Sequence, residues 1–340
     1  MRIESIRLSE LRDERRALAL AAGNIFATPE FHETWWRHAG AGRELALRAA
    51  WDGSRLAAVW PAYVWRRAPR IERFLGHGGG DELGPCGEAA AFEALRSDAL
   101  VLAEHVPTVT AGVLGVREVL AEQSPVLAID SFAGWDPYLA TRSANFRQQV
   151  RSRTRRLERE HDVVFRLATA ATLDADLDTL FRLHRARWPK GSEFARKEAF
   201  HRDFARVALD AGWNRLTVLE LDGKPAAAWY GFRFGEVDSY YQSGRDPAHE
   251  RDSVGLVLLA ATIRSAFEQR QREYRFLRGD EPYKARFTDD PGSVISGFAG
   301  RGADALSTAA RAARVSQAAA RRLARSPLRA RRGRASRQGA

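Results

Sequence analysis

The chain has 340 residues, of which 45% are hydrophobic and 29% are charged. This balance is too apolar for a disordered protein and too charged for a membrane bundle, and the length indicates two domains. A single cysteine, Cys86, excludes an internal disulfide and a zinc site built from several cysteines. The longest apolar runs, 17–22 and 254–263, are far shorter than the ~20 residues of a membrane span, and no secretory leader is recognisable. We therefore expect a cytoplasmic protein.

The net charge of +11 is concentrated at one end of the chain. Residues 301–340 contain eleven Arg and one acidic residue, Asp304, so this segment carries +10 and the remaining 300 residues carry the other +1. Lysine occurs at four positions only, and all other basic side chains are Arg, a bias that together with many Ala indicates GC-rich coding in a bacterium. Where Arg is the default, a lysine becomes a candidate for a role that needs a compact ammonium. The lysines are Lys190, Lys197, Lys224 and Lys284.

The first half alternates helical and extended patterns, as a mixed α/β domain does. Two extended stretches flank the pair Asp52-Gly53, which is typical of a hairpin turn. A helical apolar period predicts a helix over 89–104. In chain order, the predicted elements are a helix at 29–38, strands at 45–51, 56–65 and 71–75, a glycine-rich loop at 76–87, the helix at 89–104, and strands at 109–113 and 126–130.

A polar helix is predicted over 143–160, with Ser143 as its N-cap. Because it has few apolar positions, one interpretation is a solvated linker helix. The other interpretation is a basic ridge that faces a bound anion, because four arginines recur at every fourth residue. They are Arg147, Arg151, Arg155 and Arg159.

The second half repeats the alternation of helices and strands. Strands at 216–221 and 226–234 flank Asp222-Gly223, a second hairpin turn, and a third strand follows at 237–244. A long helix is predicted at 254–272, with its large apolar side chains on one face. The other predicted elements are a strand at 164–167, helices at 173–188 and 197–211, and a closing strand at 274–277.

The last 40 residues are rich in Ala and Arg. In a helix that turns about 100° per residue, five arginines share an arc of about 100°, and the opposite face is mostly Ala. That face is too weakly apolar to enter a bilayer by itself, and the composition after Pro327 is typical of disorder. We expect a basic tail, partly disordered, with an anionic partner such as nucleic acid or a membrane surface. The five are Arg311, Arg314, Arg321, Arg322 and Arg325.

Between 216 and 277 the predicted order is three antiparallel strands, a loop, a helix and a strand. This stretch resembles the core of the GNAT acyltransferase superfamily, most closely its CelD-like, FemAB-related branch, in which two GNAT-like halves are fused. The resemblance covers most of 20–298, weakly in the first half and well in the second. It is carried by DGKPAAAWYGFRFG (222–235), YYQSGRDP (240–247), SVGLVLLAATIRSAFEQ (253–269) and YRFLRGDEPYKARF (274–287).

The resemblance implies an α/β (mixed α+β) fold of two GNAT-like halves, each a mixed, mainly antiparallel twisted sheet flanked by helices. We place the N-terminal half at 1–142, the C-terminal acyltransferase half at 143–300 and the basic tail at 301–340. The active cleft is expected between the halves, with most of the chemistry supplied by the second.

The start of the helix at 254 is a candidate site for the acyl donor. A helix N-terminus presents free N–H groups and a partial positive charge, which suit a pyrophosphate. The superfamily pattern places a glycine three residues after a basic residue, whereas here Gly255 follows Arg251 by four. The alternative is that Gly255 only lets the helix pack closely on a strand. The candidate residues are Arg251, Ser253, Val254 and Gly255.

Tyr240, Tyr241 and Gln242 lie on the strand that, by the resemblance, splays from its neighbour and pairs with pantetheine through its backbone. Successive strand residues point to opposite faces, so only one tyrosine can face the cleft. The sequence does not determine which of the two tyrosines does so; we take Tyr240 and Gln242 as the candidate donor-binding residues. The resemblance implies acetyl-CoA or another acyl-CoA as co-substrate and no metal.

The segment Gly279–Lys284 directly follows the closing strand and combines acids, a hydroxyl and an ammonium. Acyl transfer to an amine needs a base, stabilisation of the oxyanion and a proton for the leaving group. Asp280 or Glu281 could take the amine proton. Lys284 could bind an oxyanion, phosphate or carboxylate, and Tyr283 could donate to the leaving thiolate. The alternative is a structural turn in which Lys284 pairs with Asp280.

Two other features have simpler interpretations. The loop His77–Glu82 gathers one histidine and two adjacent acids, which do not complete a metal-ligand set, so it is either a solvent loop or a contact for the acceptor. Cys86 has no His or Asp partner nearby in the sequence, so we do not propose a thiol nucleophile.

Together these features predict an N-acyltransferase that moves an acyl group from acyl-CoA to an amine without a covalent enzyme intermediate. The resemblance implies an acceptor that is a small molecule or a glycan precursor of the cell envelope. One alternative is an aminoacyl-tRNA donor, which the resemblance implies and which the basic helix and tail would fit. Another is a non-catalytic GNAT module that binds anionic partners through its tail.

Overall fold

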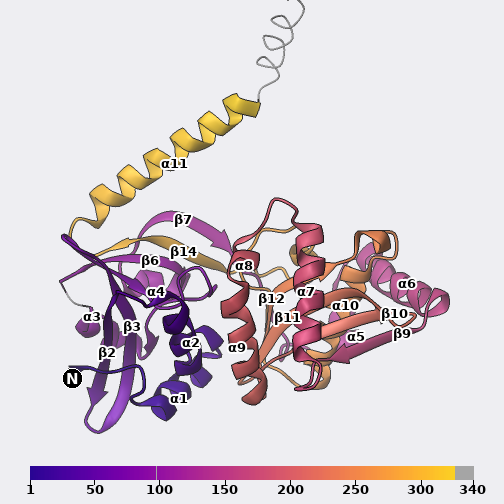
Figure 1. Ribbon diagram of the computed structural model, residues 1–340, viewed down its shortest axis with the longest axis horizontal. Coiled ribbons are helices and arrows are strands. Elements are labelled where there is room, and N and C mark those ends of the chain that lie inside the picture. Colours follow the sequence, from indigo (N-terminus) through magenta and orange to yellow (C-terminus); the bar gives the residue numbers. More distant parts are fainter. Residues whose placement is uncertain (97, 326–340) are drawn as a thin grey trace, which may run out of the picture.

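The computed structural model describes residues 1–96 and 98–325, in which two β-sheets lie side by side with helices packed on them (Figure 1). In spatial order the first sheet consists of β1 (Arg2–Ser5), β2 (Glu44–Asp52), β3 (Arg55–Arg67), β4 (Arg70–Phe74), β6 (Leu100–Pro107), β14 (Ser293–Ala299) and β7 (Arg117–Gln123), with β5 (Cys86–Gly87) paired to β3. The second sheet consists of β8 (Val126–Ala128), β13 (Glu273–Arg275), β12 (Val237–Arg245), β11 (Lys224–Phe234), β10 (Thr217–Leu221) and β9 (Val163–Leu167).

The helices lie between and around these strands. They are α1 (Arg12–Ala22), α2 (Pro29–Ala39), α3 (Phe92–Leu95), α4 (Thr108–Val113), α5 (Trp135–Thr141), α6 (Ala144–Glu160), α7 (Leu173–Arg187), α8 (Glu193–Arg196), α9 (Glu198–Asp210), α10 (Val254–Glu268) and α11 (Ala303–Arg325). Short 3₁₀ turns are η1 (Ile25–Ala27), η2 (Ala89–Ala91), η3 (Pro247–His249) and η4 (Lys284–Arg286). Within the described part of the chain, none of these helices is long and apolar enough to cross a membrane.

Both sheets follow the same plan, which confirms the predicted fold class. In each sheet four neighbouring strands pair antiparallel, β1 to β4 and β9 to β12, and one parallel pairing follows, β4 with β6 in the first sheet and β12 with β13 in the second. Each parallel pairing spans only three residue pairs in the described chain. The molecule is therefore a tandem of two mixed, mainly antiparallel units.

The two sheets exchange strands across the division predicted at residues 142 and 143. β8, from before that point, pairs with β13 of the second sheet. β14, from the far end of the second half, is inserted between β6 and β7 of the first sheet. The proposed domain boundaries stay a prediction, but the two sheets do not consist of two separate lengths of chain.

Patterns of residues close together in the sequence predicted most of the helices and strands correctly. Both hairpins form, and at the second one Asp222 (φ 51°) and Gly223 (φ 74°) adopt the positive φ values of a two-residue turn. Ser143 caps α6, because its hydroxyl accepts a hydrogen bond from the amide of Phe146 at 3.3 Å. These predictions depend on residues close together in the sequence.

Two predicted elements of the first half are wrong. Of the helix predicted over 89–104, only Ala89–Leu95 is helical, and Leu100–Pro107 is strand β6. β6 is paired on both sides, by β4 and β14, and this long-range pairing overrides the local helical period. The strand predicted over 109–113 is helix α4, whose Ala111 is buried in the core.

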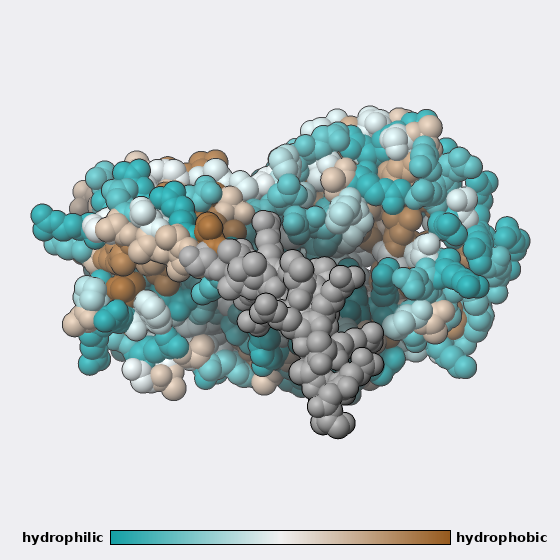
Figure 2. All heavy atoms as spheres, turned by 90° about the horizontal axis from the view of Figure 1, so that it is seen from above, coloured by the Kyte–Doolittle hydropathy of each residue, from teal (hydrophilic) through white to brown (hydrophobic). Residues whose placement is uncertain are grey.

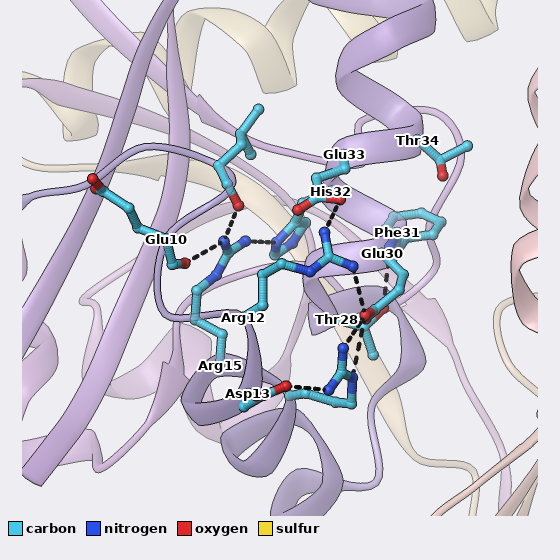
Figure 3. A network of polar contacts seen from close by, with 12 residues as sticks. Glu10, Arg12, Asp13, Arg15, Thr28, Glu30, Phe31, His32, Glu33 and Thr34 are labelled. Carbon is cyan, nitrogen blue, oxygen red and sulfur yellow. Dashed lines mark hydrogen bonds and ion pairs between the residues drawn. The ribbon is translucent and has the colours of Figure 1, made fainter. Parts of the chain in front are cut away.

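A polar network fixes α1 on α2 (Figure 3). The guanidinium of Arg12 pairs with Glu30 at 3.0 Å and also with Glu33. Arg15 is buried and donates to the carbonyl of Leu8 at 2.6 Å and contacts Nδ1 of His32 at 3.3 Å. Burial, reinforced by the charge of Arg15, holds the pKa of His32 well below its usual range, so the ring is neutral and Nδ1 accepts. The network joins two helices of the first half, and none of its residues lines the two cavities described below.

Candidate active site

The site is built where β12 and β13 stop pairing. Their parallel register ends at the pair Ser239 and Arg275, but β12 continues to Arg245 in partnership with β11 alone. One edge of the segment Tyr240–Arg245 therefore has no neighbouring strand among the described residues. This opening is the splay that the resemblance implied for the second half.

Two adjoining cavities occupy the opening. The first has a volume of about 160 Å³ and is mostly apolar, with Ala227, Trp229 and Leu259 among its walls. The second is smaller, about 50 Å³, and polar. Four residues line both cavities, so the two lie next to each other: Arg187, Tyr240, Ser243 and Tyr283.

A β-bulge in β12 places Tyr240 at both cavities and Tyr241 at the second one only. Tyr230 pairs with Gln242 and Gly231 pairs with Tyr240, so Tyr241 is the extra residue of β12. The side chain of Tyr240 stacks on Trp229 beside the first cavity. The hydroxyl of Tyr241 instead donates to the carbonyl of Gly79, in the first half, at 2.8 Å.

Three hydroxyls form a chain through the two cavities. The hydroxyl of Tyr283 donates to that of Tyr240 at 3.2 Å, and Tyr240 lies 2.6 Å from the hydroxyl of Ser243. Burial raises the pKa of Tyr283, and the neighbouring Tyr240 raises it further, so the phenol stays protonated at neutral pH. This series of three hydroxyl groups therefore holds protons that can form hydrogen bonds to a group bound in the cavity.

Three arginines at the first cavity have no carboxylate within ion-pair distance in the described chain. Arg187, on α7, donates to the hydroxyl of Ser243 at 3.3 Å. Arg286 donates to the side chain of Gln149 on α6 and lies over the ring of Phe146. Arg245 is exposed at the end of β12. Their charges are not compensated, so this rim attracts anions.

The N-terminus of α10 lies beside Arg245. A Cβ on Gly255 would lie 3.7 Å from Cδ of Arg245, an ordinary contact, so close packing does not require glycine there. The alternative interpretation of Gly255 as a packing residue is therefore not supported. Gly255 lines the first cavity, whereas Arg251, Ser253 and Val254 lie outside the linings of both cavities.

The loop before α10 contains one basic and one acidic side chain, Arg251 and Asp252. Arg251 is exposed and has no ion pair within the described residues, whereas Asp252 accepts from His249 at 2.9 Å and lies 3.8 Å from Arg156. Ser253 has a left-handed backbone (φ 57°), and its side chain caps no amide. The carboxylate of Asp252 is thus turned toward α6 and partly compensated there.

Lys284 is held inside the loop that follows β13. Its side chain is almost fully buried, and Nζ donates to the carbonyls of Leu277 at 3.2 Å and Arg278 at 2.9 Å and pairs with Glu281 at 2.9 Å. Burial lowers the pKa of Lys284, and the charge of Glu281 opposes that shift. The predicted structural turn paired this lysine with Asp280, but the partner is Glu281.

The segment predicted to be catalytic is only partly in the cavity. Glu281, Tyr283 and Lys284 line the second cavity together with Gln242. Asp280 is exposed and lines neither cavity. Of the two candidate bases, the structure therefore brings Glu281 to the site.

The glycine-rich loop of the first half is packed against the second half. The carbonyl of His77 accepts from Lys197 at 3.2 Å, and a Cβ on Gly78 would lie 1.9 Å from that ammonium. Asp81 and Glu82 are buried and pair with Arg278 at 3.3 Å and Arg275 at 2.9 Å. This segment is thus an interface loop instead of a solvent loop.

Two further observations concern metal binding and the reactivity of Cys86. In the residues that the structure describes, no group of three His, Cys, Asp or Glu side chains is placed to hold a metal ion. Cys86 lines a separate cleft between the halves, and burial raises the pKa of its thiol to about 12. That thiol is protonated at neutral pH and is a poor nucleophile.

Sequence reasoning missed Arg187, Arg245 and Arg286. They come from α7, β12 and η4, far apart in the chain, and nothing distinguishes them from the many other arginines. Arg245 lies within the block YYQSGRDP and Arg286 within the block YRFLRGDEPYKARF, and these blocks of the resemblance are the signal that could have found the two residues.

Comparisons with known proteins agree with this geometry. Residues 144–285 match the family model described as an acetyltransferase (GNAT) domain. No curated protein matches the chain significantly in sequence. The crystal structure of FemX superposes with a TM-score of 0.59 at 9% identity, covering 86% of this chain and 96% of FemX.

Two further solved structures are also similar. The C-terminal domain (DUF2156) of a putative enzyme from Agrobacterium fabrum gives a TM-score of 0.58 at 12% identity, and L-PGS from Bacillus licheniformis gives 0.55 at 13%. Each match covers 90% of this chain and 96% of the other. At these identities the likeness shows a shared fold over both halves.

Proposed function

We propose that the protein is a GNAT-type N-acyltransferase, because residues 144–285 match a GNAT acetyltransferase domain, and that its acyl donor binds in the opening beside β12. The donor is an acyl-CoA and the acceptor is an amine. The acceptor class is a small molecule or a glycan precursor.

The observation that carries the proposal is the apolar cavity rimmed by three uncompensated arginines. An acyl carrier such as CoA combines a long, weakly polar arm with phosphates at its far end. The apolar walls fit the arm, and the unpaired edge of Tyr240–Arg245 offers backbone groups to its amides. The arginine beside the first turn of α10, Arg245, fits a phosphate group.

We assign to the site a direct attack of the amine on the acyl thioester, without a covalent enzyme intermediate. The amine nitrogen attacks the thioester carbonyl, a tetrahedral intermediate forms, and the C–S bond breaks to give an amide and a thiol. Glu281, which lines the polar cavity, accepts the proton that the amine loses. Tyr283 donates a hydrogen bond to the leaving thiolate in place of the one it donates to Tyr240, and the proton that Glu281 has accepted passes to that thiolate, so protons balance.

A second donor, aminoacyl-tRNA, has one observation in its favour. The loop before α10 places Asp252 near the helix start and departs from the superfamily spacing, which is unfavourable for the pyrophosphate of CoA. α6 adds exposed arginines, although Arg147 is engaged with the carbonyls of Ala140 and Arg142. Phosphates of an RNA acceptor end would meet the same rim.

Calorimetry with acetyl-CoA and desulfo-CoA tests the proposal. We expect micromolar binding to the wild type and at least about tenfold weaker binding to Arg245→Ala, because a hydrogen bond to a charged group contributes about 1.5–3 kcal/mol. Arg66→Ala is the matched control, since Arg66 is an exposed arginine of β3 without a carboxylate partner in the described chain.

Each outcome has a distinct meaning. Equal weakening by Arg66→Ala would mean that only net charge matters and that the cavity is not the donor site. Absence of CoA binding, with transfer from aminoacyl-tRNA, would replace the donor by the second candidate. Absence of both would identify a non-catalytic GNAT module.

A further inference from the structure

The edge strand β9 exposes more large apolar side chains than any other element of the described chain. Val164, Phe165 and Leu167 are 41%, 41% and 46% exposed. By comparison, the face of the molecule seen in Figure 2 is mostly hydrophilic, with small, separated apolar areas. β9 is the last strand of the second sheet, and no described strand pairs with its outer edge (Figure 1). An apolar group bound beside β9 would remove these side chains from water.

The three side chains divide between the two faces of the sheet. Arg166 points to the face covered by α7, where it pairs with Asp176 at 2.8 Å. Successive strand residues alternate, so Val164 lies on that same face, and Phe165 and Leu167 lie on the face covered by α10. There they line a groove of about 430 Å³ between the strands and α10. The helix lines this groove with Leu258, Ala261, Thr262 and Ser265.

One row of paired residues runs across the floor of the groove. Leu167 of β9 pairs with Thr217 of β10, which pairs in turn with Trp229 of β11. Because β9 and β10 are antiparallel, Phe165 lies two residues to one side of this row and Arg215 two residues to the other. All five residues line the groove. The groove is therefore apolar at one end and cationic at the other.

The positive charge at the cationic end has no counter-ion. Arg215 is half-buried, has no carboxylate within ion-pair distance in the described chain, and donates only to the carbonyls of Gly212 at 3.1 Å and Asn214 at 2.7 Å. Burial, reinforced by the charge of Arg233, lowers the pKa of Arg215. Arg233 and Asp238 also line the groove, but two hydrogen bonds of 2.7 and 2.6 Å join them, so their charges compensate each other. One uncompensated guanidinium thus remains for an anion.

The groove differs from the opening beside β12. Trp229 and Leu258 line both the groove and the first cavity, but none of the three arginines at the first cavity lines the groove. Past its apolar end lies another groove, of about 550 Å³, between α6 and α10, which Phe165 and Ala261 also line. The apolar surface therefore continues beyond β9, with room for a long chain. This neighbouring groove adds Leu139, Val150 and Val257.

We propose that the groove on β9 and α10 binds a free long-chain fatty acid, with its carboxylate at Arg215 and its chain along Leu167 and Phe165. A guanidinium and a carboxylate form charge-assisted hydrogen bonds, and the apolar chain gains by leaving water. Arg151 and Arg155 of the neighbouring groove are exposed, where solvent and salt weaken the attraction, so the half-buried Arg215 is the stronger site. This ligand goes beyond the proposed acyl transfer and does not depend on it.

Calorimetry with dodecanoate and dodecyltrimethylammonium, both below their critical micelle concentrations, tests the proposal. The two probes have the same chain and opposite head-group charges. We expect one dodecanoate to bind per protein chain, and at least about tenfold weaker binding to Arg215→Ala, because a hydrogen bond between charged groups is lost. Arg215→Glu should reverse the preference between the two probes.

Matched variants separate the groove from other surfaces. Phe165→Ser should weaken dodecanoate binding about tenfold, whereas Val164→Ser removes an equally exposed apolar side chain from the other face of β9 and should leave it unchanged. Arg182→Ala, which removes an exposed arginine of α7 without an ion pair among the described residues, should also have no effect. The same holds for Arg245→Ala, at the opening beside β12. Thermal melting checks that every variant keeps the fold.

Each outcome supports the proposal or overturns it. Selective loss of dodecanoate binding in the Arg215 and Phe165 variants supports it. Equal affinity for the two probes, or equal effects of Phe165→Ser and Val164→Ser, would overturn it. Weakening by Arg245→Ala instead of Arg215→Ala would do so too, because the fatty acid would then occupy the opening beside β12. Absence of binding would also overturn it, and a dimer that Phe165→Ser dissociates in sedimentation would then identify a second copy of the chain as the occupant.

Discussion

Single side chains of the loop after β13 have roles that their chemistry alone does not reveal. The ammonium group of Lys284 could in principle act in catalysis or binding. In the structure it instead donates hydrogen bonds to backbone carbonyls and forms an ion pair with Glu281. These bonds close the loop that carries Tyr283 and Glu281 into the second cavity. The structure therefore gives Lys284 a positioning role, while its predicted role in binding an oxyanion remains to be tested.

Lys284→Met separates the two roles. Removing the buried ammonium leaves Glu281 and three carbonyls without their partner, and because the Glu281 side chain is 37% exposed we expect a loss of about 1–2 kcal/mol in the free energy of unfolding in urea. The double variant Lys284→Met/Glu281→Gln should recover part of that loss, because the unpaired carboxylate is gone. Wild-type stability in Lys284→Met combined with lost transfer activity would instead assign the lysine to catalysis.

At the scale of elements, a charged network holds the short parallel pairing of β4 and β6 together. Glu104 on β6 accepts from Nε of Arg73 on β4 at 2.9 Å and pairs with Nδ1 of His77, at the start of the glycine-rich loop, at 2.8 Å. Burial would raise the pKa of Glu104, but the hydrogen bond from His77 and the charge of Arg73 lower it to about 2. The network thus anchors the interface loop on the first sheet.

Glu104→Gln should destabilise the protein in a pH-dependent way. A carboxyl pKa near 2, against an ordinary value of 4.5, corresponds to about 3 kcal/mol. The lowered pKa makes this contribution fully present above pH 4.5 and lost as the pH falls toward 2. Urea unfolding should therefore show a larger difference between wild type and variant at pH 7 than at pH 3.

The control for this measurement is Glu118→Gln. Glu118 is an exposed carboxylate of β7 without an ion pair among the described residues. Its replacement should change stability little at either pH. A difference for Glu104→Gln that stays constant with pH would mean that packing, and not ionisation, explains the loss.

At the scale of the whole molecule, the two halves are joined into one folding unit. One hydrophobic core cluster contains Phe31 and Phe74 of the first half together with Phe181 and Phe204 of the second. The exchanged strands β8 and β14 and the ion pairs of Arg275 and Arg278 with the interface loop add to this connection. The two cavities beside β12 are built by the second half, and the first half supports the loop that follows β13.

A fragment of residues 1–142 should therefore not fold by itself. It lacks β14, which separates β6 from β7, so both strands would expose an unpaired edge. We expect the full chain to unfold in urea in a single transition, with coincident circular dichroism and tryptophan fluorescence, and the fragment to show no cooperative transition. A cooperatively folded fragment would instead establish the predicted boundary at residue 142 as a true domain boundary.

The sequence by itself determined the features that depend on near neighbours. The hairpin turns, the cap of α6, the long helix α10 and the strand order of the second half follow from turn residues and apolar periods within a few residues of each other. The motif blocks of the GNAT resemblance lie in this part of the chain, so the fold class was predictable there. The basic tail was also evident from composition, although residues 326–340 lie outside the described chain.

The tertiary structure alone decided how these elements form a site. The bulge at Tyr241 depends on the register between β11 and β12, and the insertion of β14 depends on a pairing nearly 200 residues away from β6 in the sequence. Arg187, Arg245 and Arg286 meet because three separate elements end at the same opening. Register and long-range pairing are set by the packing of the whole chain, and no local pattern of residues records them.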